Sequence, residues 1–159
     1  HLVNTYGAFG TVTRVRHELE IEGTDAATPE GASWRAYAFR CKPGDPGRRP
    51  CWISPYHLRL DWLMWFAAIE VGEYGGLARE TWLVALLDRL LAAEPGVLGL
   101  LASAPEFAGG APTFVRVVVY RYRFTDAGEP GWWRREFVGE LVRPVGRDDP
   151  ELRALVDEG

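Results

Sequence analysis

The spacing of apolar residues changes from a period of two to a helical period and back again along this chain, which constrains the fold strongly. Because single strands and helices do not alternate, a parallel sheet is not expected. The sequence predicts an α+β fold in the order β-β-β-α-α-β-β, with an antiparallel sheet of about five strands and helices packed on one face. The expected strands are about 3–10, 11–22, 34–41, 113–125 and 132–142, and the expected helices are about 55–69, 80–93 and 95–102.

The run SPYHLRLDWLMWF at residues 54–66 carries the clearest helix start. Ser54 can cap the first free N–H groups, and Pro55 has a helical φ and needs no donor at that position. Apolar residues then share one stripe at helical spacing: Leu58, Trp62, Trp65, Phe66 and Ile69. We therefore predict that Trp62, Trp65 and Phe66 are mostly buried. The run is too short to cross a bilayer, which needs about 20 apolar residues.

Residues 11–22 alternate in polarity, which predicts a strand with one face in the core and the other in water. The inward set is Val15, His17, Leu19 and Ile21, and the outward set is Arg14, Arg16, Glu18, Glu20 and Glu22. A lone inward histidine such as His17 is more often a core residue than a ligand.

The two C-terminal strands carry arginines within 116–123 and at 134–135. These arginines are expected to pair with Glu136, Glu140 and the glutamates of 18–22, although the cluster could instead hold an anion or an acidic partner. Trp132 and Trp133 point to opposite faces of one strand. One of them is expected in the core, and the other is expected to be exposed or to cover a loop, where it is a candidate for partner contact.

The length of 159 residues fits one domain, and the chain ends in an acidic tail at 144–159 with one short helix. Pro144 is expected to end the last strand. The formal charge of −4 argues against nucleic acid as the main partner. No stretch is long enough to span a membrane, and no signal peptide is visible. The chain opens inside a strand-like segment without a start methionine, so we expect a fragment of a longer protein.

Two cysteines, Cys41 and Cys51, bracket a loop rich in proline, glycine and arginine. Their spacing fits no metal site, and no cofactor motif is found in the chain. Two interpretations stay open, a disulfide that closes the loop or two separate buried thiols. A disulfide is favoured if the protein is secreted or luminal.

His57 and Asp61 are four positions apart, so they share a helix face and could form a hydrogen bond. An oriented imidazole is what a general base needs, and the nearby Ser54 suggests a Ser–His–Asp arrangement. The alternative is a capped helix whose polar side chains tie down neighbouring loops. Ser54 is better explained as the cap, since the GxSxG turn typical of a nucleophile is absent.

Four segments occur in this order in the lipase maturation factor family: NTYGAFG, EIEGTD, YAFRCKPGDPGRRPCWISPYHLRLDWLMWFAA and YRYRFTDAGEPGWWRRE. The chain resembles this family over about residues 2–143. The resemblance implies a polytopic membrane protein whose hydrophobic part precedes this region, with this region on the extracytoplasmic side. In vertebrates, members reside in the endoplasmic reticulum and help dimeric lipases such as lipoprotein lipase reach their active assembly. The composition is similar to that of a bacterial member, which implies the bacterial cell membrane.

The resemblance implies a chaperone-like role without catalysis or a cofactor, and no family catalytic residue is carried over. Two function classes follow. The first is a client-binding domain for a lipase-like protein, with Trp132, Trp133, Arg134 and Arg135 as the leading contact residues. The second is a small ligand-binding or hydrolytic module with a pocket near His57 and Asp61. An exposed aromatic patch favours the first class and a deep pocket favours the second.

Overall fold

The computed structural model describes residues 15–51, 58–74 and 81–158. These residues form an antiparallel four-stranded sheet in the order β2-β1-β3-β4. The strands are β1 (Arg16–Thr24), β2 (Arg35–Ala36), β3 (Phe114–Phe124) and β4 (Trp133–Gly146). The α+β class is confirmed. The expected strand at 3–10 lies outside the described residues.

β3 lies inside the sheet, between β1 and β4, as its apolar sequence predicted. It pairs with β1 from Phe114 opposite Thr24 to Tyr122 opposite Arg16. It also forms the predicted hairpin with β4, which is closed by a turn at 125–132. The register of β3 against β4 shifts at three points, including one between Val119 and Tyr120. Such bulges increase the local twist of a hairpin.

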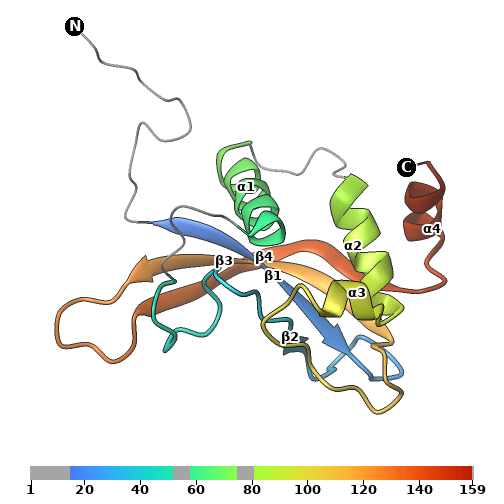
Figure 1. Ribbon diagram of the computed structural model, residues 1–159, viewed down its shortest axis with the longest axis horizontal. Coiled ribbons are helices and arrows are strands. Elements are labelled where there is room, and N and C mark those ends of the chain that lie inside the picture. The colour runs from blue at the N-terminus through green and yellow to red at the C-terminus, as the bar shows by residue number, and fades with distance from the viewer. Residues whose placement is uncertain (1–14, 52–57, 75–80, 159) are drawn as a thin grey trace, which may run out of the picture.

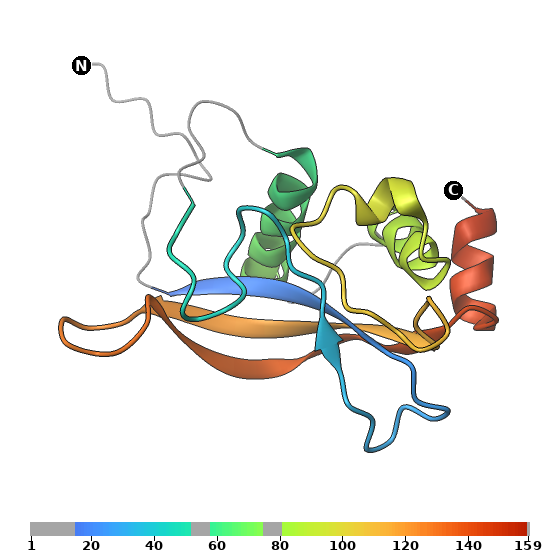
Figure 2. The ribbon, with the colours of Figure 1, turned by 60° about the horizontal axis from the view of Figure 1, so that its bottom comes forward.

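The helices cover one face of this sheet, as Figures 1 and 2 show. They are α1 (Arg59–Tyr74), α2 (Thr81–Leu91), α3 (Pro95–Leu98) and α4 (Pro150–Asp157). Asp149 caps α4, because its side chain accepts hydrogen bonds from the N–H groups of Glu151 and Leu152. None of the described helices is long and apolar enough to cross a bilayer.

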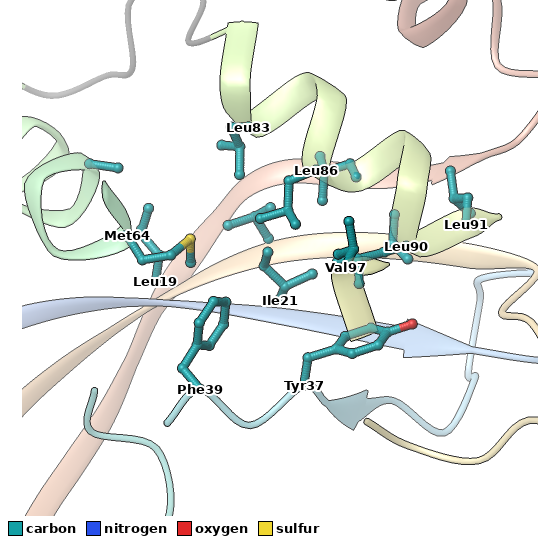
Figure 3. Packing of buried hydrophobic residues seen from close by; sticks show 14 of the residues in the cluster. Leu19, Ile21, Tyr37, Phe39, Met64, Leu83, Leu86, Leu90, Leu91 and Val97 are labelled. Carbon is teal, nitrogen blue, oxygen red and sulfur yellow. The ribbon is translucent and has the colours of Figure 1, made fainter. Parts of the chain in front are cut away.

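The core lies between this sheet face and the helices. Leu19 and Ile21 point from β1 toward the helices, where Leu19 lies beside Met64 of α1 and Ile21 lies below Leu86 of α2 (Figure 3). Burying each such aliphatic side chain contributes about 1.5–3 kcal/mol. Other core residues come from every helix and from β3 and β4: Met64, Ala67, Leu83, Val97, Val115, Val117, Val145 and Leu152.

The prediction that Trp62, Trp65 and Phe66 are mostly buried is confirmed, but they are not the most buried face of α1. The fully buried face carries Met64 and Ala68, whereas the three aromatic residues keep a minor part of their surface exposed. The three rings pack on one another, with centroids 4.9–5.5 Å apart. Helical spacing gave two neighbouring apolar stripes, and the alanine-containing stripe allows the helix backbone to approach the sheet more closely.

Two strand predictions also need correction. The segment 34–41 pairs as a strand only at Arg35–Ala36, and beyond it Ala38 forms a single bridge with Ser103. The chain then leaves the sheet edge because Cys41 and Lys42 bind to α1. Pro144 does not end β4, which continues to Gly146. β4 is an edge strand, where proline is tolerated because its missing N–H need not join the ladder.

The outward face of β1 is not wet, contrary to the prediction. Glu18, Glu20 and Glu22 are all buried, although they lie on the sheet face opposite the helices. We call this the helix-free face. Each carboxylate contacts a cation: Lys42 for Glu18, Arg135 for Glu20 and Arg116 for Glu22. These ion pairs offset the cost of removing three charges from water.

Candidate functional site

The free end of the β3–β4 hairpin carries both tryptophans selected from the sequence. Trp133 begins β4 and is 7% exposed, whereas Trp132 precedes the strand and is 46% exposed. The Trp133 indole stacks on the Phe124 ring with centroids 4.2 Å apart and an interplanar angle of 24°. Trp132 lies near Arg49, whose guanidinium carbon is 6.0 Å from the ring centroid.

Five rings form a continuous line across the helix-free face of the hairpin. We call this line the aromatic row: Phe137, Tyr120, Tyr122, Trp133 and Phe124. Neighbouring centroids are between 4.2 and 6.4 Å apart, within the range of favourable ring contacts. The middle of the row is buried at Tyr122 and Trp133, while Phe124 at one end is 61% exposed and Phe137 at the other is 53% exposed.

Strand alternation explains why these rings share one face. Tyr120, Tyr122 and Phe124 are two positions apart on β3, so they point to the same side of the sheet. The hairpin register then sets Phe137 opposite Tyr120 and Trp133 opposite Phe124. Cross-strand aromatic pairs of this kind stabilise a hairpin by about 0.2–1 kcal/mol each.

Arg135 lies in the middle of the aromatic row. Its Nη1 is 2.8 Å from Glu20 Oε1, and its guanidinium carbon is 4.6 Å from the centroid of Tyr120. The Tyr122 hydroxyl donates to the same Glu20 oxygen at 2.5 Å. Burial and this hydrogen bond raise the pKa of Tyr122, so the phenol stays protonated. Arg135 is therefore held in place by β1 and β3 as well as by β4.

Arg134 points to the opposite side of the hairpin from Arg135. It contacts Glu129 in the turn, and the cross-strand register sets it opposite Arg123 on β3. The predicted pairing of the arginines with glutamates is present at Arg116, which contacts Glu22 at 2.7 Å and Glu140 at 2.9 Å. The structure thus separates the four selected residues: Trp132 and Arg134 are exposed, Trp133 is buried, and Arg135 lies within the aromatic row.

Cys41 and Cys51 form a disulfide, with their Cα atoms 5.2 Å apart. The loop that it closes holds the end of the hairpin. Pro46 O accepts hydrogen bonds from the N–H groups of Trp132 and Trp133 at 2.9 and 3.1 Å. Gly131, which has a φ of +81°, comes so close to this loop that an added Cβ would lie 3.1 Å from Pro46 O. The contact therefore needs glycine at this position.

Asp61 has a structural role in the described residues. It is buried on α1, and its Oδ1 accepts hydrogen bonds from the N–H groups of Cys41 and Lys42 at 2.6 and 3.0 Å. This contact fixes the start of the disulfide loop against the helix. His57 and Ser54 lie outside the described residues, so the predicted His57–Asp61 arrangement is not described.

The described residues contain no group of three or more side chains that could hold a metal ion. His17 is half-buried on the inward side of β1, opposite Arg121. No further chemistry is assigned to it.

Sequence reasoning missed four residues of the aromatic row: Tyr120, Tyr122, Phe124 and Phe137. Alternation along YRYRF could have placed Tyr120, Tyr122 and Phe124 together. Alternation along β4 could also have placed Phe137 on the face of Trp133, because the hairpin register is regular as far as Tyr120 opposite Phe137. The burial of Glu20 beside Arg135 depends on β1, which lies more than one hundred positions away in the chain.

Comparison with known proteins decides the family. The profile of the Lipase maturation factor C-terminal domain matches residues 2–143, nearly the whole chain. The chain belongs to the lipase maturation factor family. The match ends at residue 143, whereas β4 continues to Gly146 and α4 follows it.

Individual lipase maturation factors are similar over almost all of this chain. Human Lipase maturation factor 1 is 45% identical over 157 residues, which cover 94% of this chain and 27% of the human protein. The bovine Lipase maturation factor 1 is 46% identical over 93% of the chain and 27% of its own length. Human Lipase maturation factor 2 is 37% identical over 98% of the chain and 22% of its own length.

The chain therefore spans about a quarter of the length of the curated relatives that it matches. Those relatives are named as maturation factors and not as enzymes. No solved structure matches the chain.

Proposed function

We propose that this chain is a non-catalytic, chaperone-like domain that binds client proteins, within a membrane-anchored factor that assists the folding and assembly of secreted proteins such as lipases. The names of its relatives support a role in lipase maturation. Since the chain matches about a quarter of their length, the activity of the whole protein is part of this proposal.

The observation that carries the proposal is the pair of exposed rings at the ends of the aromatic row. Phe124 and Phe137 remain more than half exposed on a sheet face that no described helix covers (Figure 2). Trp132 adds a third exposed ring at the hairpin end. Exposed apolar groups that gather on one surface mark sites of protein contact, and aromatic and arginine side chains dominate such contacts.

The surface is also rigid, which favours binding. Phe124 is held by the buried Trp133, and Phe137 is held by Tyr120. Pro46 fixes the backbone at residues 132 and 133 from the disulfide loop. A client that meets prearranged rings loses less conformational entropy on binding than one that must order them.

The proposed location is the extracytoplasmic side of a membrane, with a membrane-embedded region that precedes this part of the protein. The Cys41–Cys51 disulfide supports this location, because disulfides persist in oxidising compartments. The proposed absence of catalysis is supported by the names of the relatives, which are maturation factors.

The test is capture of a dimeric lipase, produced in the same cells, by the full-length protein. Phe124→Ala and Trp132→Ala are expected to weaken capture strongly, because each removes an exposed ring of the proposed surface. Leu100→Ala is the matched control, since Leu100 is an exposed apolar residue next to α3, on a different part of the fold. Undiminished capture by both aromatic variants, with the fold intact, would remove this hairpin from the client-binding surface.

A further inference from the structure

A second feature of the hairpin lies on the opposite side from the aromatic row. It is a cleft of about 280 Å³. It lies on the part of the hairpin that extends beyond α1 in Figure 1. We call it the arginine cleft, and it is lined by Val15, Arg121, Arg123, Arg134, Arg135 and Glu136. Arg121, Arg123 and Arg134 point to this face and set three guanidinium groups beside a single carboxylate, whereas the guanidinium of Arg135 is bound to Glu20 on the other face.

Arg123 is the residue in this cleft that most clearly indicates a binding role. The strand register sets it directly opposite Arg134, and like charges in this position destabilise a sheet. Arg134 contacts Glu129, and Arg121 contacts Glu136 at 2.6 Å. Among the described residues, Arg123 has no ion-pair partner within 4 Å.

The charge of Glu136 does not neutralise the cleft. The hydrogen bond from Arg121 lowers the pKa of the Glu136 carboxyl, so it stays ionised and is already engaged. The chain as a whole carries a formal charge of −4, so this excess of positive charge is a local feature of the hairpin.

We infer that the arginine cleft binds an acidic segment of the client protein, through guanidinium–carboxylate pairs centred on Arg123 and Arg134. This inference rests on the proposed client-binding function. Arg123 and Arg134 are next in sequence to Phe124 and Trp133 of the opposite face, so a client that wraps around the hairpin end can reach both faces. Guanidinium groups bind carboxylates through bidentate hydrogen bonds, which the single charged group of a lysine cannot form. The guanidiniums that line the cleft belong to exposed residues and are accessible to such a segment.

The binding test uses the full-length protein in detergent and a fluorescently labelled hexaglutamate peptide, with hexaglutamine as the uncharged control. Anisotropy should show binding of hexaglutamate that weakens as salt is raised. Arg123→Gln and Arg134→Gln should each weaken it about five- to tenfold, as expected for loss of a charge-assisted contact. Arg147→Gln is the matched control, because Arg147 is exposed and lies outside the cleft, and it should change the affinity less than about twofold.

A stability measurement separates a binding role from a structural one. Arg123→Gln should leave the thermal unfolding midpoint unchanged or slightly raised, since it removes a like-charge contact. A clear fall in the midpoint together with weaker binding would show that Arg123 supports the fold, and would overturn the inference.

Three further outcomes would also overturn it. They are no binding of hexaglutamate, a loss of affinity in Arg147→Gln equal to that in Arg123→Gln, or displacement of the peptide by inorganic phosphate at the concentration of the peptide's carboxylates. Lipase capture then separates the two proposals. If Arg123→Gln captures normally while Phe124→Ala does not, the acidic-segment inference fails and the client surface stands. If Phe124→Ala also captures normally, the client surface itself is rejected.

Discussion

The Tyr122 hydroxyl of β3 donates a hydrogen bond to the Glu20 carboxylate of β1 at 2.5 Å, across the helix-free face of the sheet. Gly44 O lies 2.6 Å from the same hydroxyl. A single phenol thus links two strands and the disulfide loop. The buried glutamate in turn positions Arg135 beside the aromatic row.

Tyr122→Phe should destabilise the fold by about 1–3 kcal/mol, because it leaves the buried Glu20 without one of its hydrogen-bond donors. A denaturant melt measures this change. Tyr120→Phe is the control, since Tyr120 lies in the same row and is only half-buried. Equal stability of the Tyr122 variant and the control variant would mean that the phenol contributes nothing to the link.

The Cys41–Cys51 disulfide should stabilise the fold by about 2–3 kcal/mol, as expected for a short closed loop. Mass measurement of the non-reduced protein should find two hydrogens fewer than in the reduced form. The double change Cys41→Ser and Cys51→Ser should lower stability to that of the reduced protein. A double variant as stable as the oxidised protein would show that the disulfide adds no stability and that the other contacts of the loop are sufficient to hold it in place.

Asp61→Ala should cost about 1–3 kcal/mol, because two backbone N–H groups lose their acceptor. Asp61→Asn keeps an acceptor oxygen and should cost less.

The purified protein should not hydrolyse ester substrates. Turnover that disappears in His57→Ala would support the hydrolytic alternative instead.

Met64→Ala should cost about 2–5 kcal/mol, since Met64 is fully buried between α1 and the sheet. Leu100→Ala removes an exposed aliphatic side chain and should change stability by less than about 0.5 kcal/mol. Denaturant melts of the two variants compare these costs directly. Similar losses would mean that α1 does not pack on the sheet through this residue.

Docking of α4 should weaken at acid pH. The hydrogen bond from Arg143, with the N–H groups of Leu152 and Glu151, lowers the pKa of Asp149 below its usual 3.8. The charged carboxylate therefore adds stability above pH 3.8, and this contribution is lost as the pH falls through the lower pKa of the folded state. Hydrogen exchange of α4 amides should quicken below about pH 4 beyond the global effect.

Asp149→Asn is the control for this pH dependence, because it keeps a capping oxygen but carries no titrating charge. Exchange in α4 of this variant should show less of the acid effect. An identical acid response in the two proteins would assign the change to other carboxylates.

The sequence alone determined the elements that local pattern controls. Alternation along residues 113–125 and the turn residues before Trp132 predicted the β3–β4 hairpin, and the 3.6-residue spacing of leucines predicted α2. The prediction that one of Trp132 and Trp133 is in the core and the other exposed is also confirmed. These features depend on neighbours a few positions apart, which the sequence displays directly.

The tertiary structure alone decided what covers each face. Trp133 is buried because the disulfide loop and Phe124 pack against it, and Gly44 in that loop lies 78 positions before its partner Tyr122. Glu20 is buried for the same kind of reason, since its cation comes from β4. In α1, the apolar pattern allowed two stripes, and contact with β1 selected Met64 over Trp62 and Trp65. Periodicity states which residues share a face, whereas burial depends on distant segments that pack on it.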